Sequence, residues 1–260
     1  MPDQRDFATG CRGPRGSRFV FFGPCPDRPD RRRGRAVGLA VLVFCAFLWL
    51  PRHGAAQATV VVSRVFDGDT VLLADGRRVR LAGIDAPETA HGLAPAQYFA
   101  AAATRELMRL TRGVPLRFVP VGRGEDRYGR ALGDLVLPDG TSVAVRMLAA
   151  GAAFFLWNRD LPEVLAARFL AAQREAMDAG RGFWPRILSL PPPPGGYIGN
   201  AASRRFHVPG CPDAARIGRR NQVRLPDAAA AFAGGFAPAR ECSPWPPARA
   251  SEAGNRTDMP

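Results

Sequence analysis

Apolar and polar residues alternate through much of the chain after residue 58, and this period of two predicts short β-strands. Asp75–Gly76 and Asp139–Gly140 each follow a strand-like run, and an Asp-Gly pair in this position is a strong signal for a hairpin turn. The sequence therefore predicts strands within TVVVSRVF (59–66), TVLLADGRRVRLAGI (70–84, two strands), VPLRFVPV (114–121) and ALGDLVLPDGTSVAV (131–145).

Three other stretches predict helices. Pro95 suits a first helical turn and Gly113 suits a C-cap, so a helix is expected from Pro95 to about Arg112. Two more are expected at about 143–150 and 161–179, each ending before a glycine. Short antiparallel strands with few helices fit an α+β fold, a small closed or half-closed barrel with helices packed on one side.

The first 58 residues have a different character. Residues 1–35, rich in Pro, Gly and Arg, are predicted to be a disordered basic leader. The last four arginines of this leader precede an apolar run (36–50), and an A-x-A triplet ends at residue 58. This order is typical of an export signal, and 15 apolar residues are few for a spanning helix, which needs about 20. We interpret 36–58 as a signal peptide, with an uncleaved membrane anchor as the alternative.

The proline-rich stretch PPPPGG indicates a second boundary near the other end of the chain. The predicted organisation is a barrel domain at 59–188, a linker at 189–198, a small α+β module at 199–246 and a disordered tail at 247–260. We expect a monomer. The folded part is expected outside the cytoplasm: secreted, periplasmic or anchored to the membrane through residues 36–50.

Charge adds a modest indication of the partner. The formal net charge is +13, and every basic residue is Arg, because the 260-residue chain contains no Lys. Without residues 1–58 the chain keeps 26 Arg against 19 acids, a net charge of +7. A basic surface favours a polyanion, either nucleic acid or an anionic membrane.

The segment FDGDTVLLADGRRVRLAGIDAPE concentrates acids around an arginine at strand ends, where turns bring side chains together. Asp69 and Asp85 are suitable ligands for a hard cation such as calcium. Glu88 is then available as a general base, and Arg80 could grip a phosphate, with Arg130 of EDRYGRAL as its counterpart. A metal, a base and two arginines are what hydrolysis of a phosphodiester requires.

In this order and at these distances, DGDT, VRLAGIDAPE, DRYGRAL and the closing GRGFWP resemble the staphylococcal nuclease (thermonuclease) family. The resemblance covers about Thr59 to Pro185. It implies an OB-type five-stranded β-barrel with about three helices, which cleaves DNA and RNA with calcium as cofactor.

The resemblance also implies roles for single residues. It gives calcium ligation to Asp69, Asp85 and the backbone carbonyl of Ala86, catalysis to Glu88, phosphate binding to Arg80 and Arg130, and nucleotide contact to Tyr128. Trp157 falls near the place of a second tyrosine, where it could stack on a base but lacks the hydroxyl. We assign Asp67 to the turn, and we interpret Asp126 and Arg127 as a solvated loop pair.

The segment 199–242 resembles the small zinc-binding domain of the Ada DNA-repair protein, through FHVPGC, NQVRL, AAAAFAGGF and GFAPAREC. The resemblance implies zinc ligands at His207, Cys211, Ala239 and Cys242, but alanine cannot bind a metal. Zinc held by three protein ligands and a Cys211–Cys242 disulfide both remain open, and we prefer a disulfide or an empty site. The barrel is expected to work without residues 191–260.

The sequence as a whole favours an exported or membrane-anchored, calcium-dependent nuclease that acts on DNA and, as a second substrate, RNA. One alternative is a non-catalytic nucleic-acid-binding or protein-binding module on the same barrel. The other is a structural protein of the cell envelope. The intact carboxylate set favours the enzyme, because a binding module has no need of it.

Overall fold

The computed structural model describes residues 59–242 and 245–248. The predicted leader (1–35), the predicted signal or anchor (36–58) and most of the predicted tail (249–260) lie outside the described residues. Within the described ranges, no helix has both the length and the apolar character needed to cross a membrane.

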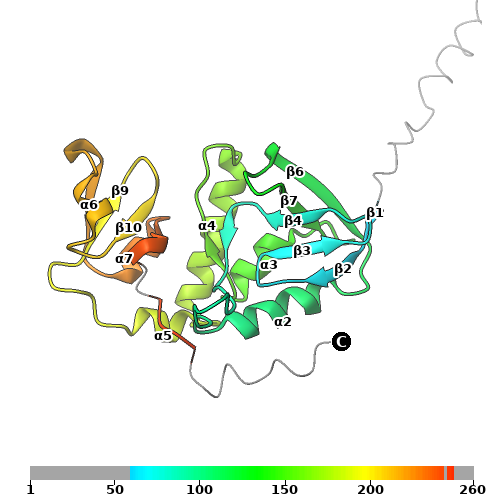
Figure 1. Ribbon diagram of the computed structural model, residues 1–260, viewed down its shortest axis with the longest axis horizontal. Coiled ribbons are helices and arrows are strands. Elements are labelled where there is room, and N and C mark those ends of the chain that lie inside the picture. Colours follow the sequence, from blue (N-terminus) through cyan, green and yellow to red (C-terminus); the bar gives the residue numbers. More distant parts are fainter. Residues whose placement is uncertain (1–58, 243–244, 249–260) are drawn as a thin grey trace, which may run out of the picture. The chain divides into compact units, whose positions relative to one another are not determined.

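The N-terminal half forms the predicted barrel, whose sheet has the strand order β1-β6-β7-β4-β3-β2. The strands are β1 (Thr59–Val60), β2 (Val62–Val65), β3 (Thr70–Leu73), β4 (Arg78–Leu81), β6 (Leu116–Glu125) and β7 (Ala131–Val136). In Figure 1 β2, β3 and β4 lie side by side with α2 (Ala100–Thr111) running below them. The hairpin predicted at Asp75–Gly76 joins β3 to β4, which pair antiparallel.

The barrel closes because its two edge strands are parts of one bent strand. β1 pairs with β6 and β2 pairs with β3, yet only Val61 separates β1 from β2. Counted as one, they reduce the six strands of the sheet to the five that the sequence predicts. The α+β prediction with an OB-type barrel is therefore confirmed.

The helices confirm two predicted segments and shorten a third. α3 (Val143–Ala149) begins after Ser142, whose Oγ accepts from the backbone N–H of Val145, and α4 (Glu163–Asp178) follows Pro162. α2 starts five residues later than predicted, because the chain before it forms turns and Phe99 has a left-handed backbone (φ 71°). The late start leaves Gln97 outside the helix, where its side chain reaches the site described below.

The C-terminal part is a second α+β layer built on the sheet β11-β9-β10-β12. The nuclease-like half ends in α5 (Trp184–Leu188). The C-terminal elements are β9 (Tyr197–Asn200), β10 (Arg205–His207), α6 (Pro212–Ala215), η1 (Arg219–Asn221), β11 (Gln222–Leu225), α7 (Ala228–Ala233), β12 (Ala237–Pro238) and η2 (Arg240–Cys242). We call residues 197–248 the C-terminal module. β5 (Ile84–Asp85) and β8 (Phe154–Phe155) form a separate two-stranded pair beside the barrel.

An aromatic core joins the barrel's helices to the C-terminal module. Phe232 of α7 is fully buried, with ring centroids 4.9 Å from Trp184, 5.7 Å from Phe154 and 5.4 Å from Phe206. Trp184 and Phe154 belong to the nuclease-like half and Phe206 to the module. Burying rings of this size is among the largest single contributions to packing, so the two halves stabilise each other.

The ordered chain also extends past the predicted end of the module. Pro247 pairs with Gln97, and the backbone N–H of Ala248 donates to the carbonyl of Ala96 at 2.8 Å. The predicted start of the disordered tail at residue 247 falls within this pairing.

Candidate active site

The turn Asp67-Gly68-Asp69 positions the first carboxylate. Asp67 Oδ1 accepts from the backbone N–H of Asp69 at 2.9 Å, which confirms the turn role predicted for Asp67. A Cβ on Gly68 would lie 2.6 Å from that of Ala86, so only glycine lets the turn pack this closely. The DGDT motif thus holds Asp69 against the chain that follows β5.

Arg80 joins the two predicted metal carboxylates. Its Nη1 lies 2.7 Å from Asp69 Oδ2 and its Nη2 lies 2.5 Å from Asp85 Oδ1. Nη1 also donates to the carbonyl of Ile84 at 3.0 Å. Ala86 enters the same network, because its backbone N–H donates to Asp69 Oδ2 at 2.9 Å. All three charged side chains are buried, so the charges act on one another with little screening.

Burial sets the protonation tendencies of this cluster. It raises the pKa of Asp69 well above its ordinary value, with Asp67 and Asp85 adding to the effect and Arg80 opposing it. Burial also works against the charge of Arg80, but Asp69 and Asp85 outweigh it and raise the Arg80 pKa. Arg80 is therefore a permanent cation among acids that would otherwise repel one another.

Glu88 lies at the exposed side of this cluster, with 55% of its side chain accessible. Its backbone N–H donates to Gln97 Oε1 at 2.8 Å, which fixes the turn that carries it. Partial burial is the main cause that raises the pKa of Glu88, Asp85 adds to it, and Arg240 opposes it. A half-exposed carboxylate with a raised pKa can reach water and take a proton from it.

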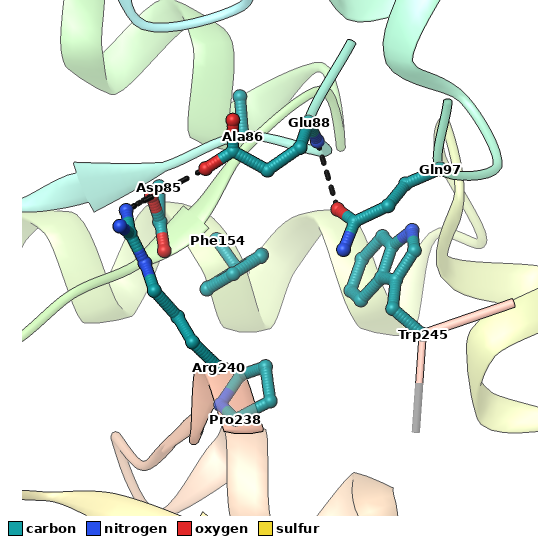
Figure 2. Close-up of a pocket in the computed structure, with 8 residues that line it drawn as sticks. All are labelled: Asp85, Ala86, Glu88, Gln97, Phe154, Pro238, Arg240 and Trp245. Atoms are coloured by element: carbon teal, nitrogen blue, oxygen red, sulfur yellow. Dashed lines mark hydrogen bonds and ion pairs between the residues drawn. The ribbon is translucent and has the colours of Figure 1, made fainter. Parts of the chain in front are cut away.

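Glu88 opens onto a pocket with a volume of about 170 Å³, enough for a few water molecules at about 30 Å³ each. Figure 2 shows its lining: Asp85, Ala86, Glu88, Gln97, Phe154, Pro238, Arg240 and Trp245. The last three belong to the C-terminal module. The pocket is therefore built by both halves of the described chain.

Arg130 is not in contact with this cluster among the described residues. It precedes β7, whose Leu132 pairs with Arg80, and its Nε and Nη2 both lie 2.8 Å from Asp126 Oδ2. Asp126 therefore pairs with Arg130, and the interpretation that it pairs with Arg127 is wrong. The pKa of Asp126 is lowered by hydrogen bonds from the backbone N–H groups of Arg130 and Tyr128 and from the Arg130 side chain, although partial burial opposes this shift.

The two predicted nucleotide-contacting aromatics differ in their surroundings. Tyr128 is 62% exposed, and the guanidiniums of Arg127 and Arg130 lie 4.8 and 5.4 Å from its ring centre. Trp157 is partly buried and packs against the barrel core, and it does not line the pocket. Tyr128 thus offers a ring face at a positively charged surface, whereas Trp157 is placed as a packing residue.

A second cluster lies in the C-terminal module. Nδ1 of His207 is 3.6 Å from Cys211 Sγ and 3.3 Å from Cys242 Sγ, and the three ligand atoms lie within 4.8 Å of one another. A hydrogen bond with Cys242 is the main cause that lowers the pKa of Cys211. In the described part of the chain the two cysteines do not form a disulfide, so the disulfide preferred from the sequence is not borne out. Ala239, the position to which the Ada resemblance gives a fourth ligand, follows Pro238, and its backbone N–H donates to the carbonyl of Phe206, the residue before His207.

Sequence reasoning missed Gln97 and Arg240. Gln97 was placed inside a predicted helix, and only the turn geometry brings its amide to Glu88. Arg240 stands two positions before Cys242, in a segment read for its metal ligands. No sequence signal connects it with Glu88, which lies 152 positions away.

The donor set at the first cluster fits calcium. Asp69, Asp85 and the carbonyl of Ala86 supply only oxygen, which is calcium's preference. Asp67, Asp69, Asp85 and Glu88 all act electrostatically on Arg80. With Arg240 included, four carboxylates face two guanidiniums, an excess of two negative charges when all are ionised. Such a cluster favours a divalent cation.

Comparison with known proteins identifies the family of the chain. The family model described as staphylococcal nuclease homologue matches residues 78–186. An "Uncharacterized endonuclease" of Escherichia coli O157:H7 is 36% identical over 154 residues, covering 58% of this chain and 92% of that protein. The "Thermonuclease" of Staphylococcus intermedius is 32% identical over 130 residues, covering 48% of this chain and 76% of that protein. The "Succinoglycan biosynthesis protein ExoI" of Rhizobium meliloti strain 1021 is 31% identical over 149 residues, covering 55% of this chain and 73% of that protein.

The fold and the site define an OB-type barrel with a buried Asp–Arg–Asp cluster beside an accessible glutamate. The chain belongs to the family of staphylococcal nuclease homologues. The C-terminal module lies beyond the residues matched by the family model.

Proposed function

We propose that the chain is a calcium-dependent nuclease that hydrolyses phosphodiester bonds in DNA and, as a second substrate, RNA. Its class, a phosphodiester-hydrolysing nuclease, follows from its family. The observation that carries the finer proposal is the buried Asp69–Arg80–Asp85 cluster with Glu88 beside it in an open pocket. A binding-only module, the alternative, gives no reason to bury two carboxylates against an arginine beside an accessible glutamate.

Asp69, Asp85 and the Ala86 carbonyl are the residues that would hold calcium. Bound there, the ion would polarise the phosphate and offset charge on its oxygens. Glu88 acts as the general base, because its carboxylate lines the pocket and is half exposed to water. It takes the proton of the attacking water.

Arg80 supplies fixed positive charge next to the reacting phosphate. Both of its terminal nitrogens are engaged by carboxylates, so a bidentate grip on phosphate requires at least one of these contacts to exchange. Its buried position strengthens electrostatic stabilisation of the transition state, because water does not screen it.

Arg130 and Tyr128 are proposed to bind the nucleic acid beside the cleaved bond. Tyr128 exposes a ring on which a base can stack, and the neighbouring guanidiniums attract phosphate. For Trp157, base stacking remains a prediction, since its ring packs against the barrel core.

The His207–Cys211–Cys242 cluster is proposed to bind zinc with three protein ligands. Support comes from the mutual approach of one imidazole and two sulfurs, which is the ligand chemistry zinc prefers. Export, or anchoring to a membrane, remains a proposal based on residues 36–58, and so does the monomeric state.

The test uses residues 59–260 with plasmid DNA and with a structured RNA. Cleavage should occur with calcium, stop when a calcium chelator is added, and return when calcium is restored in excess. Full cleavage in the chelator would contradict the calcium dependence. Absence of cleavage under every metal condition, combined with tight binding of the plasmid, would favour the binding-only alternative.

A further inference from the structure

Arg240 is an arginine that the C-terminal module contributes to the catalytic pocket. Its Nη2 lies 3.5 Å from Glu88 Oε1 and 4.0 Å from Asp85 Oδ1. Figure 2 shows its side chain reaching from the module toward these two carboxylates. It lies outside the residues 78–186 matched by the family model, so the family's own residues do not include it.

The backbone that carries Arg240 is fixed on both sides. Before it, Pro238 is paired in β12, and the N–H of Ala239 donates to the carbonyl of Phe206 at 2.9 Å. After it, Cys242 Sγ contacts His207 Nδ1 at 3.3 Å, and Trp245 Nε1 donates to the carbonyl of Tyr98 at 3.0 Å. The segment that carries the Arg240 side chain is thus anchored by contacts on both sides of it.

Arg80 and Arg240 are held to different degrees. Arg80 makes contacts of 2.5 and 2.7 Å with buried carboxylates, whereas Arg240 approaches at 3.5 and 4.0 Å and keeps 58% of its side chain exposed. Long, solvated ion pairs contribute little stability, so Arg240 can exchange them at low cost. Its contacts with the pocket carboxylates use Nη2, and a guanidinium has donors on all three nitrogens.

We propose that Arg240 binds a phosphate of the nucleic-acid substrate at the pocket, next to the bond that Glu88 attacks through water. This inference rests on the proposed nuclease function and identifies part of its substrate site. A guanidinium matches the geometry of a phosphate through paired hydrogen bonds. Arg80 supplies the buried positive charge and Arg240 the accessible one, so the C-terminal module completes the substrate site.

The test compares Arg240→Ala and Arg240→Lys with the control Arg224→Ala. Arg224 is an exposed arginine of the same module on β11, at the opposite edge of the sheet from β12, so the control removes the same charge away from the pocket. Circular dichroism first establishes that each variant is folded. Hydrolysis of a short single-stranded DNA is then measured with calcium at several salt concentrations, and binding of the same DNA is measured by fluorescence anisotropy in chelator.

Arg240→Ala should raise KM and the Kd of the DNA about tenfold, with a smaller change in kcat. The slope of log Kd against log salt should fall by about 0.7, the loss of one phosphate contact on a single strand. Arg240→Lys should keep the slope and recover part of the affinity, while Arg224→Ala should stay within about twofold of the parent.

Unchanged Kd and salt slope in Arg240→Ala would overturn the proposal. So would faster hydrolysis in that variant, which would mean that Arg240 restrains Glu88. If the parent binds DNA without cleaving it, the proposed function fails, yet the anisotropy data still decide whether Arg240 binds phosphate.

Discussion

Gln173 is a buried polar residue that ties the C-terminal module to the β5–β8 strand pair. Its Oε1 accepts from the backbone N–H of Phe155 at 2.6 Å, and its Nε2 donates to the carbonyl of Phe232 at 2.7 Å. Phe155 lies in β8, which pairs with the Ile84–Asp85 strand. One side chain therefore links α7 of the module to the strand pair that contains Asp85.

The cost of Gln173→Ala follows from the groups left behind. The Phe232 carbonyl still accepts from the N–H of Gly235 at 3.0 Å, so it keeps one partner. The N–H of Phe155 loses its acceptor in a fully buried environment, at a cost of about 1–3 kcal/mol. With the small cavity added, we expect the free energy of unfolding to fall by about 2–3 kcal/mol.

Urea unfolding of residues 59–260, followed by tryptophan fluorescence, measures this loss. With a slope of about 2 kcal/mol per molar urea, the midpoint should fall by about 1–1.5 M. Arg174→Ala is the matched control, because the next residue on α4 also bonds the module, through the carbonyl of Ala233, but is exposed. The control should lose less than about 1 kcal/mol, and a Gln173→Ala variant as stable as the control would refute the linking role.

Further outcomes are expected for the pH profile, for zinc and for truncation of the chain. Burial and Asp85 raise the pKa of Glu88. Because a general base must be ionised, kcat/KM should fall as the pH decreases through the Glu88 pKa, which lies above the ordinary value for glutamate. Arg240 opposes this shift, so Arg240→Ala should move that limb of the pH profile to higher pH, and a shift to lower pH would contradict the geometry. Zinc should raise the Tm of residues 59–260 but not that of His207→Ala, and an equal response in both would exclude the cluster as the site. Deleting residues 191–260 should cost several kcal/mol of stability and lower nuclease activity, because the shared aromatic core is lost. Full activity without these residues would instead support the sequence-based expectation that the barrel works alone.

Local signals predicted the barrel well because its strands and turns are fixed by neighbouring residues. The Asp75–Gly76 turn, the alternating β3 and β4 and the DGDT turn all depend on contacts within a few positions. The closure of the sheet was harder to predict from the sequence. It depends on a single interruption at Val61, which sends one strand to both edges.

The cluster was predicted where its residues lie in one short segment of the chain and not where they come from distant elements. Asp69, Arg80 and Asp85 were found because they fall within one short motif, and the structure brings them together. Arg240 and Gln97 reach Glu88 only through tertiary packing, which a sequence pattern does not encode. The start of α2 was misplaced for a related reason, since the fold places a left-handed turn at Phe99 ahead of it.

The measurement that tests the central claim most directly is the single-turnover cleavage rate of Glu88→Gln with calcium present. Glutamine keeps the size and polarity of the side chain but cannot take a proton, so the rate should fall about a hundredfold or more while folding and DNA affinity stay close to the parent. Glu163→Gln, which changes an exposed glutamate at the start of α4, should cleave like the parent. Cleavage by Glu88→Gln at the rate of this control would show that Glu88 is not the base and that the site described here does not perform the hydrolysis.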